Sequence, residues 1–224
     1  MQYETPYAAP TLTVDLVGFQ IVDGELCVLV LRRPNEPFRG TWALPGGYNP
    51  EGETTITALQ RIIQHKVGLE IDKDFSYIEQ LYTFDTVARD PRGHAVSVTY
   101  LACGHTVELP AGDSETIFTP LSALPELAYD HADIIDYARK RLVAKLAYTN
   151  IAFAFLPPKF TLTELQSVYE ALLGRKLDKR NFRKKILSQT IVSPSGELRS
   201  DAAHRPAQLY QFDHQELQEA TEAF

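Results

Sequence analysis

The sequence predicts an α/β sandwich, with a mixed sheet between helices, followed by a small α+β winged helix-turn-helix domain. In the first part of the 224 residues, strand and turn patterns alternate around one amphipathic helix. After Tyr148 the pattern changes, and Pro157-Pro158 interrupts the helical periodicity. Two short helical segments and two strand patterns follow. These observations divide the chain into domains of residues 1–148 and 149–224.

The first domain is predicted to contain two strand pairs and two helices. The strand patterns cover residues 11–22, 26–31, 77–84 and 95–102, and the helical patterns cover 132–146 and a segment that ends at 67–69. Asp23-Gly24 separates the first two strands and is a typical hairpin pair. Asp90-Pro91-Arg92-Gly93 lies between the other two and fits a type I turn with proline at its second position.

The second domain begins with a helix whose start carries a capping box. Thr161 is the predicted N-cap, and Glu164 stands three residues later. Asp178 is predicted to cap the next helix, in which Phe182 and Ile186 are one turn apart and point inward. Two short helices joined by a tight turn predict a helix-turn-helix.

A wing is predicted to complete this domain. Residues 190–192 and 207–212 have strand composition, and a long loop that starts at Ser193 joins them. The acidic tail, residues 215–224, is expected to be a short helix or a frayed end, and no role is assigned to it.

Charge is unevenly distributed along the chain. The net charge is −7, but residues 174–185 hold seven basic residues against the single Asp178. Residues 151–224 contain ten basic and nine acidic residues, so they carry +1 and the preceding part carries −8. The average therefore hides a basic patch.

Other features of the composition are typical of a cytoplasmic protein with no membrane partner. No apolar run approaches the roughly 20 residues of a membrane span, and Met1–Thr5 is not a cationic signal-peptide start. Cys27 and Cys103 lie in apolar strand-like runs without metal-site or redox spacing, so both are expected to be buried free thiols.

The segment from Gly46 to Leu69 has the spacing of a phosphate-handling loop and helix. Gly47 is followed by Glu53, then by Arg61 and by the closing Gly68-Leu69. This pattern resembles the Nudix box of enzymes that hydrolyse nucleoside diphosphates linked to another moiety. In that family three glutamates follow the arginine and hold a divalent metal ion. The corresponding positions here are Ile62, His65 and Lys66.

Loss of those glutamates predicts binding without hydrolysis, with no catalytic residue and no metal site. Hydrolysis of a pyrophosphate needs a hard cation, and hard cations bind carboxylate oxygens. Ile62 supplies no ligand, and the cationic Lys66 would repel a metal and pair with a phosphate instead. The simpler alternative is an ordinary amphipathic helix, in which Ile63 and Val67 face the core.

An effector pocket is predicted around this segment. Arg89 and Arg92 flank a rigid turn, and a guanidinium matches the oxygens of a pyrophosphate in a planar fork. The alternative is a plain hairpin with exposed arginines. The residues expected to bind the effector are Arg39, Gly46, Gly47, Lys66, Arg89 and Arg92, and no cofactor is expected.

A DNA-binding surface is predicted on the second helix of the helix-turn-helix. If Phe182 and Ile186 point inward, its basic side chains line the outer face, which can enter a major groove. Asn181 is a candidate for adenine, and Arg180 or Arg183 for guanine. The alternative is a solvated cationic helix. The predicted DNA-binding residues are Lys179, Arg180, Asn181, Arg183 and Lys184 on the helix, and Arg199 and Arg205 on the wing, with His204 beside them.

Together the two halves resemble the Nudix-related transcriptional regulators of bacterial NAD metabolism, the NrtR type. The resemblance implies a homodimer that binds a palindromic DNA operator, represses genes of NAD synthesis or salvage and senses ADP-ribose or a related nucleotide. Three alternatives are an ADP-ribose pyrophosphatase with an attached DNA-binding module, a regulator of the same architecture that responds to a pentose, and a binding scaffold without a DNA role.

Overall fold

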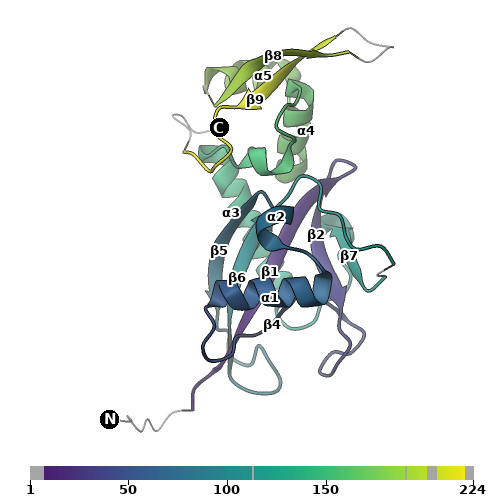
Figure 1. The fold of residues 1–224 in the computed structure, drawn as a ribbon, viewed down its shortest axis with the longest axis vertical. Coiled ribbons are helices and arrows are strands. Elements are labelled where there is room, and N and C mark those ends of the chain that lie inside the picture. The colour runs from purple at the N-terminus through teal and green to yellow at the C-terminus, as the bar shows by residue number, and fades with distance from the viewer. Residues whose placement is uncertain (1–7, 113, 190, 201–205, 220–224) are drawn as a thin grey trace.

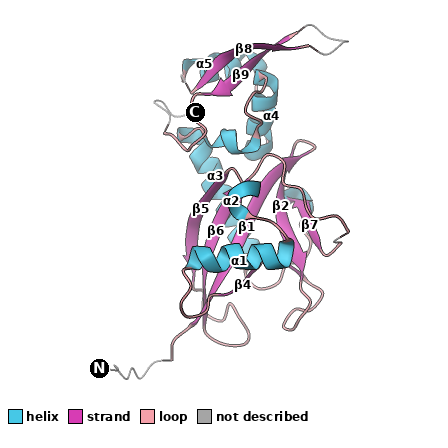
Figure 2. Ribbon diagram, in the orientation of Figure 1, coloured by secondary structure: helices cyan, strands magenta, loops and turns pink. Residues whose placement is uncertain are grey.

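The computed structural model describes residues 8–112, 114–189, 191–200 and 206–219, and it has a sheet domain joined to a smaller helical domain (Figures 1 and 2). The strands are β1 (Thr11–Val22), β2 (Glu25–Arg32), β3 (Trp42–Ala43), β4 (Gly46–Tyr48), β5 (Tyr77–Phe84), β6 (Ala95–Cys103), β7 (Thr116–Pro120), β8 (Val192–Arg199) and β9 (Ala207–Phe212). The helices are α1 (Thr55–Val67), α2 (Ile71–Asp74), α3 (His131–Tyr148), α4 (Leu162–Leu173) and α5 (Lys179–Ser188), with 3₁₀ helices η1 (Leu121–Ala123) and η2 (Ile151–Phe155).

β1 is the central strand of the mixed sheet, a sheet type that the sequence predicts. It runs parallel to β6 and antiparallel to β2 and to β4. β5 continues the sheet beyond β6, and β3 and β7 pair with β2. Asp23 and Gly24 both have positive φ, 51° and 81°, as the predicted two-residue hairpin requires. The glycine segment expected as a loop is partly the short strand β4, because Gly46–Tyr48 pairs with Thr13–Asp15.

Helices cover both faces of this sheet, with α1 in front of the strands and α3 behind them in Figure 1. Side chains alternate across β1, so Val14 and Leu16 pack in the cluster under α1, whereas Val17 and Phe19 pack in the cluster under α3. Ile134 and Leu142 of α3 are fully buried. The predicted α/β sandwich is therefore confirmed, and Cys27 and Cys103 are buried free thiols within it.

The helix-turn-helix is also confirmed in its local details. Thr161 and Glu164 form the reciprocal capping box of α4, and Asp178 caps α5 by accepting from the Asn181 amide. Phe182 and Ile186 are 3% and 0% exposed, so one face of α5 packs inward.

The wing differs from the prediction, because residues 193–199 belong to strand β8 and not to a loop. Pro194 is the reason the segment looks unlike a strand, since proline cannot donate a backbone hydrogen bond. Pro194 is paired with Tyr210 of β9. The backbone N–H and C=O of Tyr210 are already bonded to the backbone of Phe160, at 2.7 and 2.9 Å, so Tyr210 needs no donor from residue 194. Thr190 lies outside the described residues.

The two domains share one hydrophobic cluster. Leu142 and Leu146 of α3 belong to it together with η2, α4, Phe182 and Phe212. The described part of the tail, residues 213–219, is not a helix. It is an irregular segment that packs against Asn150, between α3 and η2. The Asn150 side chain donates to the backbone oxygens of His214 and Glu216 and accepts from the Gln218 amide. None of the helices in the described residues has the length and apolar character needed to cross a membrane.

Candidate functional site

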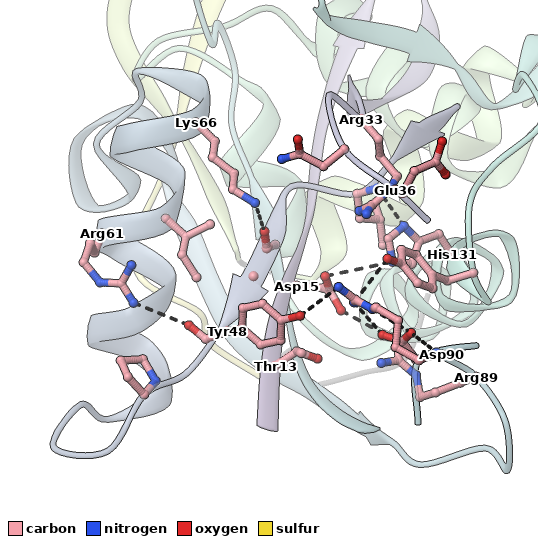
Figure 3. A pocket seen from close by; sticks show the side chains of 18 residues that line it. Thr13, Asp15, Arg33, Glu36, Tyr48, Arg61, Lys66, Arg89, Asp90 and His131 are labelled. Carbon is pink, nitrogen blue, oxygen red and sulfur yellow. Dashed lines mark hydrogen bonds and ion pairs between the residues drawn. The ribbon is translucent and has the colours of Figure 1, made fainter. Parts of the chain in front are cut away.

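The larger domain holds a cavity of about 480 Å³, which lies between α1 and the segments that precede α3 (Figure 3). Its size is within the roughly 300–1,000 Å³ of small-molecule sites. The described residues that line it are Thr13, Asp15, Arg33, Asn35, Glu36, Leu44, Gly46, Gly47, Tyr48, Pro50, Arg61, Ile62, Lys66, Arg89, Asp90, Arg92, Tyr129 and His131. Five of the six residues predicted to bind the effector are among them.

Gly46 and Gly47 form one wall because the backbone of β4 passes close to its neighbours. A Cβ on Gly46 would lie 1.9 Å from Asp15 Oδ1 and 2.6 Å from the Val14 carbonyl oxygen. A Cβ on Gly47 would meet only the ends of flexible side chains, Ile62 at 3.2 Å and Lys66 at 3.6 Å. Glycine at position 46 is therefore required by close packing.

We expect Gly46→Ala to destabilise the protein by about 1–3 kcal/mol, because the added methyl forces β4 away from Asp15. Chemical denaturation of the two variants measures this effect. Gly47→Ala is the matched control and should cost less than about 1 kcal/mol, since the side chains it meets can move. Equal stability of the two variants would contradict the role of the Gly46 contact.

Residues of α1 form the adjacent wall, in contact with β4. Arg61 makes a forked pair with Glu53, at 2.8–3.1 Å, and so braces the loop against the helix. Ile62 and Lys66 line the cavity, but His65 is not among the described lining residues. The Lys66 ammonium donates to the Gly46 carbonyl oxygen at 2.7 Å. Desolvation of this ammonium, with the nearby charge of Arg33, lowers the pKa of Lys66 from its usual value.

The two predicted arginines line the cavity, but both are already paired with carboxylates. Arg92 forms a forked ion pair with Asp90 and also donates to the Tyr48 and Tyr129 hydroxyls. This pairing lowers the pKa of Asp90 and raises that of Arg92. The expected turn is present, since the Gly93 amide donates to the Asp90 carbonyl oxygen.

Arg89 is buried below this turn, with 5% of its side chain exposed, so the alternative of exposed hairpin arginines does not apply to it. Its guanidinium donates to both oxygens of Asp130, at 2.9 and 2.8 Å. Asp15 lies 3.8 Å from the same guanidinium and also accepts from the Ser97 hydroxyl. Asp130 stands at the N-cap position of α3, but its carboxylate forms no cap hydrogen bond with the described residues.

His131 lies next to this charge cluster, at the first position of α3. Its Nδ1 accepts from the Leu44 amide at 2.9 Å, and its Nε2 lies 4.0 Å from Asp15 Oδ1. Complete burial lowers the pKa of His131, although the charge of Asp15 opposes that shift. The imidazole is therefore held neutral, with its proton on Nε2.

Arg39, which the sequence suggested for the effector, lies outside the cavity. It is exposed, and its Nε donates to the Pro34 carbonyl oxygen. The loop folds back through hydrogen bonds from Gly40 to Arg33 and from Arg33 to Thr41, so Arg33 lies at the base of the loop and faces the cavity. Trp42, which follows this loop, packs against the core and Arg32.

Arg33 and Tyr129 also line the cavity, although neither was predicted from the sequence. The Tyr129 ring contacts the guanidinium of Arg33 at 4.8 Å and that of Arg92 at 6.0 Å. Phe38 packs edge-on against the same ring at 4.8 Å. Tyr129 has a φ of 57°, which a tyrosine rarely adopts, so its position is imposed by the surrounding structure. No local pattern in the sequence marks either residue.

The cavity is lined by both carboxylates and cations. Within the part of the chain that the structure describes, no three His, Cys, Asp or Glu side chains are grouped closely enough to hold a metal ion. Asp15 and Asp90 are each bonded to other side chains instead. The cavity combines these acids with the cations of Arg33, Lys66, Arg89 and Arg92, which suit an anionic ligand.

The second candidate site is the outer face of α5. The five residues predicted there, Lys179, Arg180, Asn181, Arg183 and Lys184, are all exposed. Lys179 and Arg180 occupy the first turn, where positive charge is unfavourable for a helix, and the helix contains no acidic residue. Helix stability therefore does not explain this charge, and cations on an exposed helix face are suited to phosphates.

The predicted contribution of the wing is only partly in the described structure. Arg199 pairs with Glu164 at 2.6 Å, and its guanidinium also reaches the Lys159 carbonyl oxygen. This side chain braces the wing against the start of α4, because the capping-box glutamate is its partner. His204 and Arg205 lie outside the described residues.

Comparison with known protein families assigns a match to each domain. Residues 11–138 match the NUDIX domain, and residues 152–212 match the NrtR DNA-binding winged helix domain. The chain is 35% identical over 219 residues to the ADPR responsive transcriptional repressor NtrR of Acinetobacter baylyi. The aligned residues cover 94% of this chain and 86% of that protein. It is 40% identical over 136 residues to the ADP-ribose pyrophosphatase of Methanocaldococcus jannaschii, over 59% of this chain and 76% of that protein.

Solved structures of Shewanella oneidensis NrtR resemble this chain or its first domain. One crystal structure has a TM-score of 0.80 and 34% identity, over 96% of this chain and 100% of that chain. Its complex with a 27mer DNA has a TM-score of 0.75 and 35% identity, over 90% and 93% of the two chains. Its NUDIX domain with ADP ribose has a TM-score of 0.55 and 36% identity, over 62% and 94%.

Proposed function

The chain belongs to the NrtR family, in which a Nudix domain precedes a DNA-binding winged helix, and from that premise we propose that it is a transcriptional repressor controlled by ADP-ribose. Its operator controls genes of NAD synthesis or salvage, and it acts in the cytoplasm. The domain boundary lies after Tyr148, where α3 ends.

The position of Lys66 carries the proposal for the effector domain. This lysine stands where the Nudix box has a metal-binding glutamate, and its ammonium points at the Gly46 carbonyl oxygen in the cavity (Figure 3). A fixed cation at a metal position favours binding of a pyrophosphate but cannot activate a water molecule as a metal ion does. Gly46, Gly47, Lys66, Arg89 and Arg92 are the proposed effector-binding residues, with Arg33 and Tyr129 added.

The exposed cations of α5 support the second part of the proposal. A homodimer places two copies of α5 in successive major grooves, so the operator is a palindrome with half-sites one helical turn or a multiple apart. Lys179, Arg180, Asn181, Arg183 and Lys184 are the proposed DNA-binding residues. The structure of Shewanella oneidensis NrtR complexed with a 27mer DNA supports DNA as the partner.

We expect the protein to bind ADP-ribose in EDTA and to hydrolyse it negligibly, because Ile62, His65 and Lys66 supply no carboxylate for a metal ion. Calorimetry in EDTA measures binding, and product release with Mg²⁺ or Mn²⁺ measures turnover. Turnover on the order of 1 s⁻¹ or faster would support the alternative of a pyrophosphatase. Binding of a pentose in place of ADP-ribose would support the related sugar-responsive regulator.

Two arginines of one loop form a matched control for this binding. Arg33→Ala should weaken ADP-ribose binding by about 1.5–3 kcal/mol, because it removes a cation from the cavity wall. Arg39→Ala should leave the affinity unchanged, since that side chain points away. Equal effects of the two variants would show that ADP-ribose binds elsewhere.

A further inference from the structure

We propose that the ion pair between Arg89 and Asp130 is the joint through which an occupied cavity moves α3. This inference rests on the proposed function and assigns the element that couples the two domains. Arg89 lines the cavity, and its two hydrogen bonds to Asp130 end at the residue that directly precedes α3. The pair is buried, with 5% and 13% of the two side chains exposed, so solvent and salt screen it little.

Asp130 binds Arg89 although it stands where an aspartate normally caps a helix. It occupies the N-cap position of α3, yet its carboxylate binds Arg89 and makes no cap hydrogen bond with the described residues. Aspartate is among the best N-caps, and a negative charge at a helix N-terminus is favourable. If Arg89 withdraws, the first-turn amides of α3 can therefore receive this carboxylate. Such an exchange makes the start of α3 a two-state element.

A phosphate-bearing ligand supplies the competitor for Arg89. The guanidinium already lies between two carboxylates, since Asp15 is 3.8 Å from it. The planar fork that binds Asp130 also matches the oxygens of a pyrophosphate. A ligand beside Asp15 therefore competes with Asp130 for the same donors.

Tyr129 adds a second connection between the ligand and this joint. It precedes Asp130 and is held at a φ of 57° among cavity-lining groups. Because Arg33 and Arg92 both contact its ring, a ligand that draws these cations away removes contacts that hold the strained conformation. Relaxation of Tyr129 turns the backbone at Asp130.

Movement of the first turn of α3 is transmitted to the winged helix through one continuous helix. The helix is continuous from His131 to Tyr148. Leu142 and Leu146 near its end are buried in the cluster that also contains η2, α4 and Phe182. A tilt of α3 therefore shifts α4 and α5 relative to the sheet domain.

The test measures a coupling factor, the ratio of the operator dissociation constants of the full chain with and without saturating ADP-ribose. Fluorescence anisotropy of labelled operator gives both constants. We expect a factor of about 5 to 150 in the natural protein and below about 2 in Asp130→Asn, which keeps an N-cap side chain but lacks the carboxylate. Asp136→Asn is the matched control, because Asp136 is also on α3 and pairs with Arg139 and Lys140 on its exposed face. Its factor should equal that of the natural protein.

A natural coupling factor in Asp130→Asn would overturn this joint while leaving the proposed function intact. A factor of about 1 in the natural protein would overturn the proposed function, and the joint with it. If Asp130→Asn lacks a cooperative thermal transition, Arg89→Lys replaces it in the test. That variant keeps the positive charge without the fork, and its factor should fall at least about threefold. An unchanged factor in Arg89→Lys overturns the joint equally.

Discussion

Raising the salt concentration from about 50 to 200 mM should weaken operator binding by the homodimer about 10³- to 10⁵-fold. The physical reason is release of counterions when the cations of α5 neutralise DNA phosphates. About eight phosphates per dimer predict a slope of about −7 for log K against log salt concentration. Anisotropy titrations of the full chain at several salt concentrations give this slope, and a flat dependence would exclude the role proposed for α5.

The contribution of individual cations can be separated with paired variants. Arg183→Ala with Lys184→Ala removes four cations from the dimer, so the slope should change from about −7 to between about −3 and −4. Lys73→Ala is the control, because Lys73 is an exposed, paired lysine on α2 in the other domain. It should leave the slope unchanged. A similar change in both variants would mean that net charge, rather than the α5 surface, controls binding.

ADP-ribose should weaken operator binding about 5- to 150-fold, which corresponds to a coupling free energy of about 1–3 kcal/mol. α3 begins in the wall of the cavity and ends in the core of the winged helix, so a ligand that changes its first turn changes the spacing of the two α5 helices in the dimer. That spacing must match the fixed repeat of the duplex. Release of DNA is therefore the expected response.

Reciprocity provides the internal check on this prediction. Saturating operator must weaken ADP-ribose binding by the same factor, because the coupling free energy is shared by the two equilibria. Calorimetric titration with ADP-ribose, in the presence and absence of operator, measures this change in ADP-ribose affinity. Equal operator affinities with and without ADP-ribose would exclude it as the effector, and the same titration with NAD, phosphoribosyl pyrophosphate or a pentose would identify the ligand that acts.

Local interactions explain which features could be predicted from sequence alone. The hairpin at Asp23-Gly24, the capping box of Thr161 and Glu164, and the Asp178 cap each depend on residues within a few positions. Periodicity also identified α3 as a helix and the inward face of α5. Such features are encoded by spacing, and so the sandwich and the helix-turn-helix were predicted correctly. The positions of Ile62, His65 and Lys66 in the Nudix box followed from spacing in the same way.

Contacts between distant segments decided what the sequence could not. Arg89 and Asp130 are 41 positions apart, and Arg199 is 35 positions from Glu164, so neither ion pair has a local pattern. Pro194 can lie in a strand because its partner, Tyr210, makes its backbone hydrogen bonds with Phe160 instead. The choice of Arg33 over Arg39 depends on how one loop folds back. The sequence by itself determined the helices and strands and the charges that they carry. The tertiary structure decided which of these charges face the cavity and which form ion pairs. The reason is that ion pairs and loop conformations depend on neighbours that only the fold brings together.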